Sequence, residues 1–186
     1  MIGIFGGAFD PPHNGHVALL RAAKEQLGVD RMLVLVAANP GHKPVETPAA
    51  VRLDLARAAF PGEEVVVDDH ARTVDALRAH PEWTDPVFVI GADEFADFLS
   101  WKEPDEVLRL ARIAVAARPG YPRQGLEAVL EGVARPDRVR FFELAEPQAS
   151  SALRSSWRLD DVPPAVAEIV EREGLYGQRH GYTERS

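Results

Sequence analysis

Residues 1–16 read MIGIFGGAFDPPHNGH, and this stretch decides the fold. Its first five residues form an apolar run of the kind that makes a buried strand. Two glycines follow, and we expect the strand to end there in a sharp turn that leaves room for a ligand. A helical pattern comes next, with Asn14 as its predicted N-cap. His13 and His16 therefore lie where a strand gives way to a helix N-terminus, whose free N–H groups and positive dipole favour phosphate.

The rest of the chain alternates apolar runs with helical patterns. Five further runs predict buried strands, at residues 31–37, 64–68, 86–90, 112–117 and 139–144. Helical patterns lie at 17–27, 47–58, 73–80 with Thr73 as N-cap, on either side of 100–102, and at 126–133, 150–153 and 164–173. Strand–helix–strand units of this spacing imply parallel pairing. We therefore expect one α/β domain over residues 1–186. Its fold would be a Rossmann-like, doubly wound parallel sheet of about six strands, with helices on both faces and ligands beyond the carboxyl ends of the strands.

The composition excludes several classes of protein. Among 186 residues, 46% are hydrophobic and 27% are charged, which is ordinary for a globular chain. The net charge of −8 argues weakly against a nucleic-acid partner, because such proteins usually present a basic face. The absence of cysteine excludes a disulfide, a thiol nucleophile and a Cys-ligated metal. No apolar run approaches about 18 residues, so we expect no membrane span. The sequence starts on an apolar strand, so we expect no signal peptide and a cytoplasmic protein.

The spacing of His13 and His16 brings both imidazoles to the mouth of one helix start. Two imidazoles beside free N–H groups can hold a phosphate and stabilise the charge that develops during transfer at phosphorus, with no covalent step. The alternative is a pair of surface histidines near a helix cap. A zinc site is disfavoured because no third ligand stands nearby at the usual spacing. The glycines do not form a Gly-x-Gly-x-x-Gly fingerprint, which counts against a dinucleotide-binding dehydrogenase.

Further polar residues follow the predicted strands at the same edge of the sheet. His42 and Lys43 make a second cationic point after the second strand, unless they belong to a merely solvated loop. Asp93 follows the fourth strand, where its carboxylate is placed to accept hydrogen bonds from ribose hydroxyls or to contact a metal-bound water.

The first stretch resembles the signature of the nucleotidyltransferase superfamily, whose members carry a Gly-rich first turn and a His-x-x-His or Thr-x-x-His pair. Later segments are similar to bacterial nicotinate-nucleotide adenylyltransferases, and the likeness extends from residue 3 to residue 176. These segments are Pro40-Gly41-His42-Lys43, Ile90-Gly91-Ala92-Asp93-Glu94-Phe95, Trp101-Lys102, Arg118-Pro119-Gly120-Tyr121 and Gln148-Ala149-Ser150-Ser151-Ala152-Leu153-Arg154. The resemblance implies adenylyl transfer from ATP to nicotinate mononucleotide, which yields nicotinate adenine dinucleotide and pyrophosphate in NAD biosynthesis.

From the residues and this resemblance we predict a site of three parts. The predicted catalytic residues are His13, His16, Lys43 and Arg154. The predicted ATP site comprises Gly6, Gly7, Phe9, His16, Gly91, Asp93, Ser150, Ser151 and Arg154. The predicted nicotinate mononucleotide site comprises Ala8, His42, Lys43, Thr73, Trp101, Lys102 and Arg118, with Trp101 stacking on the pyridine ring. No residue is predicted to ligate a metal, since Mg²⁺ is expected to be held mainly through the ATP phosphates. The resemblance also allows a homodimer.

Two groups have a structural alternative. Trp101 is alternatively a half-buried core aromatic, and the 150–154 segment is alternatively a helix cap with a surface arginine. The chain also departs from the family pattern at Gly41, Lys102, Gln148 and Ala149, and residues 154–162 make a shorter segment than usual, whereas Ala8 fits the pattern but offers no hydroxyl.

Other functions stay open at this point. Pantetheine-phosphate adenylyltransferases share the first motif, although residues 91–121 do not resemble theirs. A nicotinamide-mononucleotide enzyme differs only in a few loop donors, and a nucleotide-binding regulator would keep the fold without turnover. Class I aminoacyl-tRNA synthetases use a related histidine pair, but this chain is too short and too acidic for a tRNA surface.

Overall fold

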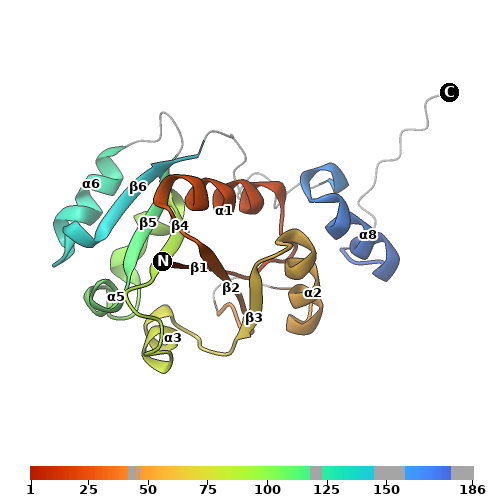
Figure 1. Ribbon diagram of the computed structural model, residues 1–186, viewed down its shortest axis with the longest axis horizontal. Coiled ribbons are helices and arrows are strands. Elements are labelled where there is room, and N and C mark those ends of the chain that lie inside the picture. Colours follow the sequence, from red (N-terminus) through yellow and green to blue (C-terminus); the bar gives the residue numbers. More distant parts are fainter. Residues whose placement is uncertain (42–44, 46, 118–122, 145–157, 177–186) are drawn as a thin grey trace.

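The computed structural model describes residues 1–41, 45, 47–117, 123–144 and 158–176. Its sheet has six strands in the order β3-β2-β1-β4-β5-β6 (Figure 1), and every neighbouring pair is parallel. The strands are β1 (Ile2–Gly7), β2 (Arg31–Ala37), β3 (Glu64–Asp68), β4 (Val87–Gly91), β5 (Arg112–Ala117) and β6 (Val139–Glu143). This order confirms the predicted doubly wound sheet, and its reversal between β1 and β4 is where such folds bind ligands.

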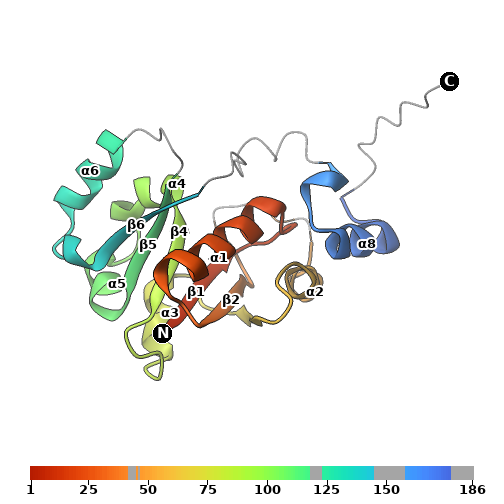
Figure 2. The ribbon, with the colours of Figure 1, turned by 45° about the horizontal axis from the view of Figure 1, so that its top comes forward.

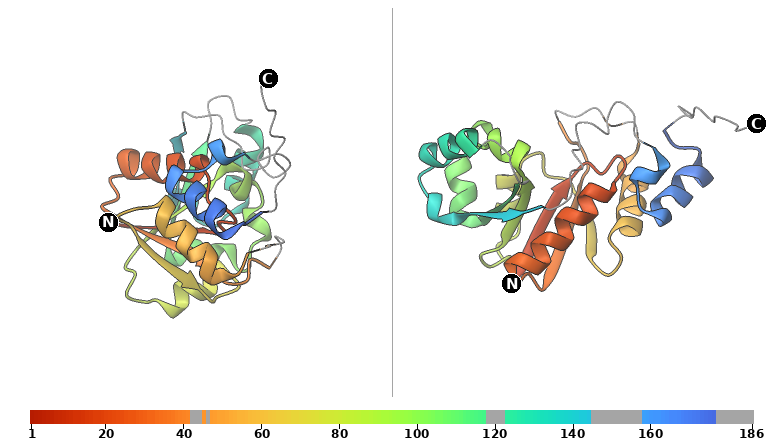
Figure 3. Two further views of the ribbon diagram at one scale, coloured as in Figure 1. Left: turned by 90° about the vertical axis from the view of Figure 1, so that its right-hand side faces the viewer. Right: turned by 90° about the horizontal axis from the view of Figure 1, so that it is seen from above.

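Helices cover both faces of the sheet (Figure 2). One core lies under α1 (Asn14–Leu27), α2 (Ala49–Ala59) and α8 (Pro164–Glu173). The other core lies under α3 (Thr73–Ala79), α4 (Ala92–Ala96), α5 (Pro104–Leu110) and α6 (Arg123–Gly132). Short 3₁₀ turns occupy Phe98–Ser100, Pro136–Arg138 and Leu159–Asp161. α8 packs against α2 and lies at the opposite end of the molecule from α6 (Figure 3).

Alternate residues of the central strands supply the two cores. On β1, Phe5 belongs to the core under α1 and α2, while Ile4 belongs to the core under α3 and α5. Val34 and Leu33 divide in the same way on β2. Because both faces of a parallel sheet are covered, its strands read as continuous apolar runs, which is why the runs in the sequence located them.

The end of β1 differs from the prediction. The strand does not stop before its two glycines, because Gly6 and Gly7 continue the parallel pairing with Leu35 and Val36 of β2. A Cβ atom on Gly7 would lie 2.9 Å from the ring of Phe9. The glycine is therefore needed for the close approach of that ring to the strand, and the turn comes after it.

Two helix caps also differ from the prediction. His13 is the N-cap of α1, with extended φ and ψ of −128° and 171°, and Asn14 is the first helical residue. The Asn14 side chain instead donates a hydrogen bond of 3.1 Å to the carbonyl of Asp160. Arg72 is the N-cap of α3, so Thr73 begins that helix rather than capping it. The result at α1 is that His13 lies on the turn itself, one position before the helix.

Two remaining predictions concern helices. α6 begins at Arg123 rather than at residue 126, and the helix predicted at 150–153 lies outside the described residues. Among the described residues, no helix is both long and apolar enough to cross a membrane.

Candidate active site

The carboxyl ends of the parallel strands bring the predicted site residues to one edge of the sheet. β1 leads to His13, β3 leads to Thr73, and β4 ends at Gly91. The residues predicted after β2, β5 and β6 lie outside the described residues: His42, Lys43, Arg118, Ser150, Ser151 and Arg154. The described ends of β5 and β6 lie side by side, with the Leu144 N–H donating 3.0 Å to the carbonyl of Ala117.

The two histidines form a stacked pair at the start of α1. Their ring centroids are 3.6 Å apart and their planes are inclined by 28°. The backbone N–H of His13 donates to Nδ1 of His16 over 3.1 Å. A backbone N–H can only donate, so Nδ1 of His16 is the acceptor and a neutral His16 carries its proton on Nε2. This contact leaves His16 with a fixed ring N–H, the kind of donor that a phosphate oxygen accepts.

His13 is the buried member of the pair, with 9% of its surface exposed. Burial lowers the pKa of His13 to about 4, against the opposing charge of Asp161. The imidazole is therefore neutral near pH 7. Its Nδ1 is buried and has no hydrogen-bond partner within the described part of the chain. Such an atom costs free energy unless a water or a ligand supplies the hydrogen bond.

A cluster of buried phenylalanines packs against the His16 ring. Phe9 is 2% exposed and meets His16 edge-on, with centroids 5.2 Å apart. Phe5 and Phe60 pack edge-on against Phe9 in turn. Phe9 has a φ of 50°, a left-handed conformation that is uncommon for a bulky side chain. The Phe9 side chain therefore packs against His16, and its contact with ATP stays a prediction.

Arg52 of α2 is a site component that the sequence analysis missed. It is 1% exposed, and its guanidinium donates to four backbone carbonyls. The acceptor Ala8 lies in the loop after β1. Ala37 is the last residue of β2, Ala38 follows that strand, and Thr47 precedes α2. A signal was available: α2 buries residues 52, 55, 56 and 59, so this arginine occupies the apolar stripe of its helix. We call His13, His16, Phe9 and Arg52 the histidine side of the site.

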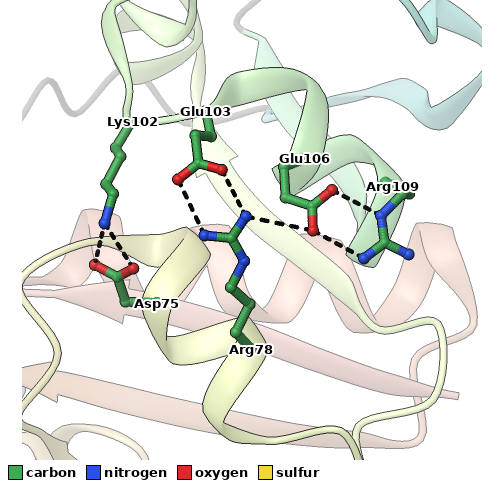
Figure 4. Close-up of polar contacts among 6 residues, drawn as sticks. All are labelled: Asp75, Arg78, Lys102, Glu103, Glu106 and Arg109. Atoms are coloured by element: carbon green, nitrogen blue, oxygen red, sulfur yellow. Dashed lines mark hydrogen bonds and ion pairs between the residues drawn. The ribbon is translucent and has the colours of Figure 1, made fainter.

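The opposite side of the site, the α3 side, comprises Thr73, Asp75, Trp101 and Lys102. Lys102 reaches from the turn before α5 to the carboxylate of Asp75 on α3, at 2.9 and 3.1 Å (Figure 4). The hydrogen bond from Lys102 lowers the pKa of Asp75. Thr73, the first residue of α3, is thereby joined to the turn that carries Trp101. Three of the predicted pyridine-site residues, Thr73, Trp101 and Lys102, therefore belong to one braced unit, while Ala8 lies in the loop after β1.

The same brace continues along α3 and α5. Arg78 of α3 binds the carboxylates of Glu103 and Glu106, and Arg109 binds Glu106 (Figure 4).

Trp101 packs against Phe98 with centroids 5.2 Å apart, and edge-on against Phe88 at 6.3 Å. Trp101 is therefore half-buried with core neighbours, as its structural alternative described, and its stacking on a pyridine ring stays a prediction.

The other predicted residues line the strand ends. Gly91 is the N-cap of α4, and a Cβ added to it would meet nothing within 4 Å, so its backbone faces open space. Asp93 lies in the first turn of α4 and is exposed. A Cβ on Gly6 would approach Phe88 to 3.3 Å. Ala8 presents its carbonyl to Arg52 rather than to the solvent side of the loop.

Comparison with known proteins decides the family. Residues 4–158 match the cytidylyltransferase-like family. The chain belongs to the cytidylyltransferase-like family. Within it, the chain is 34% identical over 197 residues to a protein of Thermus thermophilus named "Probable nicotinate-nucleotide adenylyltransferase", covering 94% of this chain and 98% of that one. A protein of the same name from Chlorobium luteolum is 32% identical over 196 residues, covering 94% and 97%.

A solved structure shows the same fold at lower identity. The Plasmodium falciparum nicotinic acid mononucleotide adenylyltransferase, complexed with NaAD, superposes with a TM-score of 0.73 at 17% identity and covers 94% of this chain and 96% of that one. Together with the curated relatives, this confirms the resemblance to nicotinate-nucleotide adenylyltransferases and the Rossmann-like α/β fold. The individual site residues stay predictions, supported where described by the geometry of this cytidylyltransferase-like protein.

Proposed function

We propose that this protein transfers the adenylyl group of ATP to nicotinate mononucleotide, forming nicotinate adenine dinucleotide and pyrophosphate. The observation that carries the proposal is the stacked His13–His16 pair at the start of α1, with His16 locked as an Nε2–H donor. The names of the curated relatives supply the substrates. A pair of this kind suits chemistry at phosphorus, where positioning and charge stabilisation do most of the work.

The reaction is a displacement at the α-phosphorus of ATP. An oxygen of the nicotinate mononucleotide phosphate forms the new P–O bond, and the bond from the α-phosphorus to the oxygen bridging to the β-phosphorus breaks, so pyrophosphate leaves with the bonding electrons. The attacking phosphate is already an anion and needs no general base. His13 and His16 donate hydrogen bonds to the reacting phosphates, while Lys43 and Arg154 hold the β- and γ-phosphates.

Mg²⁺ belongs to this proposal as a companion of ATP. Within the described ranges, no three His, Asp or Glu side chains cluster closely enough to hold a metal ion. We propose that the ligands of this ion are mainly phosphate oxygens and water. When bound, the ion would offset negative charge on the ATP phosphates.

The remaining predicted residues divide between the two substrates. Gly6, Gly7, Gly91 and Asp93 would line the nucleotide along the strand ends, with Ser150 and Ser151 at the triphosphate. Thr73, Trp101 and Lys102 on the α3 side, with Ala8, His42 and Arg118, would receive the pyridine nucleotide. Because Lys102 is engaged by Asp75, its contribution would be to place Trp101 and Thr73.

The test is pyrophosphate release from Mg-ATP with three acceptors offered in parallel: nicotinate mononucleotide, nicotinamide mononucleotide and phosphopantetheine. We expect a strong preference for the first. Equal use of the two pyridine mononucleotides would keep the chemistry and remove the acid selectivity. Release with phosphopantetheine alone, or with none of them, would contradict the proposal.

Three further features are part of the same proposal. The chain would act as a single domain, since the family match spans residues 4–158 and α8 packs against α2. It would work in the cytoplasm and without nucleic acid, and a homodimer would be the oligomeric form to look for by light scattering.

A further inference from the structure

We propose that Arg52 is a positioning residue, which fixes the loop after β1 against the end of β2 and the residues before α2, and so holds the backbone that leads to His13. This inference rests on the proposed function. Arg52 lies on α2, beside β2 and β3 (Figure 1), and is not predicted to touch either substrate.

The contacts of Arg52 are distributed over three backbone segments. Nη1 donates 2.7 Å to the carbonyl of Ala8 and 2.7 Å to the carbonyl of Ala37. Nη2 donates 3.0 Å to Ala38, and Nε donates 2.9 Å to Thr47. One planar group therefore joins the loop that leads to His13 with the end of β2 and with Thr47 before α2. These three segments cannot move apart without breaking these bonds.

The chemistry of the four acceptors makes an arginine necessary here. All four are backbone carbonyls. They lie around one point, so they need several N–H donors that spread outward from a single group. A guanidinium offers five N–H groups in a fixed plane, whereas the ammonium group of lysine offers three on one nitrogen. Burying a charge is costly without such bonds, so a residue of this kind persists where the segments it joins must keep one arrangement.

A second contact holds the same loop from the C-terminal side. Tyr176 follows α8, and its hydroxyl donates a hydrogen bond of 2.6 Å to Oδ1 of Asp10. The other carboxylate oxygen, Oδ2, accepts a hydrogen bond from the Thr47 N–H at 3.4 Å. Thr47 is thus an anchor shared by Arg52 and Asp10. The loop carrying the histidines is consequently fixed from α2 and from the segment that follows α8.

The experiment compares Arg52→Met and Arg52→Lys with Arg57→Met as the matched control. Arg57 lies on the same helix, its side chain is 58% exposed, and its nearest carboxylate is Asp54 at 3.8 Å. Formation of nicotinate adenine dinucleotide is measured per folded molecule, at a temperature where circular dichroism shows each variant to be folded. We expect kcat to fall about 100-fold in Arg52→Met and about 10-fold in Arg52→Lys, because transfer at phosphorus is sensitive to small displacements.

The split between kcat and KM separates positioning from mere stability. We expect KM for both substrates to change less than kcat, and Arg57→Met to behave as the wild type. A normal kcat per folded molecule in Arg52→Met would overturn the proposal, and so would failure of both Arg52 variants to fold, because Arg52 would then be a determinant of the fold alone. If the wild-type protein makes no dinucleotide, the proposed function has failed, and that outcome is distinct from an active wild type with active Arg52 variants.

Discussion

Arg52 on the histidine side and Lys102 on the α3 side each join separate segments of the candidate site, but by different physical means. The Arg52 side chain is buried and donates to four backbone carbonyls. The Lys102 side chain is 46% exposed and pairs with the exposed carboxylate of Asp75. Buried hydrogen bonds are insulated from solvent, whereas exposed ion pairs are weakened by water and salt. The contacts of Arg52 therefore hold the histidine side more firmly than the pair of Lys102 and Asp75 holds the α3 side.

The largest effect should come from His16. His16→Ala removes the oriented Nε2–H donor and should lower kcat about 100- to 1000-fold, the usual cost of losing one charge-stabilising donor in a transition state. The measurement is dinucleotide formation at saturating ATP and nicotinate mononucleotide. His80→Ala, which removes a histidine at the C-terminal end of α3, serves as the control. Near-normal turnover of His16→Ala would remove the histidine side from the chemistry.

The buried state of His13 should appear as acid sensitivity. Its pKa is lowered to about 4 in the folded protein, from about 6.5 in the unfolded chain, so the unfolded chain takes up the proton first as the pH falls. Above about pH 6.5 the protonation of His13 does not lower the free energy of unfolding. As the pH falls from there toward 4, it lowers that free energy by up to about 3 kcal/mol.

The check is urea unfolding of the wild type and His13→Gln at about pH 7 and about pH 4.5. The wild type should lose more of its free energy of unfolding than the variant between the two conditions. Equal losses would show that His13 is not the buried neutral group described. His80→Gln, which removes a half-buried histidine that contacts Glu82, is the comparison.

A smaller effect is expected at the C-terminal anchor of the histidine side. Tyr176→Phe removes the hydroxyl that donates to Asp10, and the carboxylate then loses one of its bonds. We expect a loss of about 1–2 kcal/mol in the free energy of unfolding. A double-mutant cycle with Asp10→Asn would locate the effect in this pair, and additive losses would mean that the two residues act separately.

The smallest effect should come from the α3 side. Lys102→Met and Asp75→Asn break an exposed pair, so each should shift Tm by about 2 °C or less, and their coupling should disappear in about 1 M salt. Thermal unfolding of both single variants and the double variant at two salt concentrations measures this. A coupling as large as that between Tyr176 and Asp10, and insensitive to salt, would erase the contrast between the two sides.

Much of the fold could be predicted because its strands are buried on both faces. The six apolar runs correspond to six strands, and the βαβ spacing correctly indicated parallel pairing. The predicted end of β1 was wrong because a glycine in a sequence indicates either a turn or a close contact. The position of the Phe9 ring against Gly7 shows that a close contact applies here. The caps were wrong by one residue because His13 and Arg72 lack the usual capping side chains but have the required extended backbone.

The site was predicted unevenly for a physical reason. The His13–His16 pair could be found because its spacing along one helix brings the rings together. The locked tautomer of His16 depends on a backbone N–H of the same turn, which spacing alone does not reveal. Arg52 was missed because its acceptors are carbonyls distant in sequence, and the contact of Lys102 with Asp75 was missed because it joins residues 27 positions apart. Local patterns predict residues that act together within one turn, and they miss those that join separate segments.

The most direct test of the central claim follows the phosphorus atoms of ATP. ATP labelled at the α-phosphorus and ATP labelled at the γ-phosphorus are each incubated with the wild-type protein and nicotinate mononucleotide, and the products are separated. We expect the α-label to enter the dinucleotide and the γ-label to leave in pyrophosphate. Transfer of the γ-label to the mononucleotide, or recovery of both labels in unreacted ATP, would contradict adenylyl transfer by this protein.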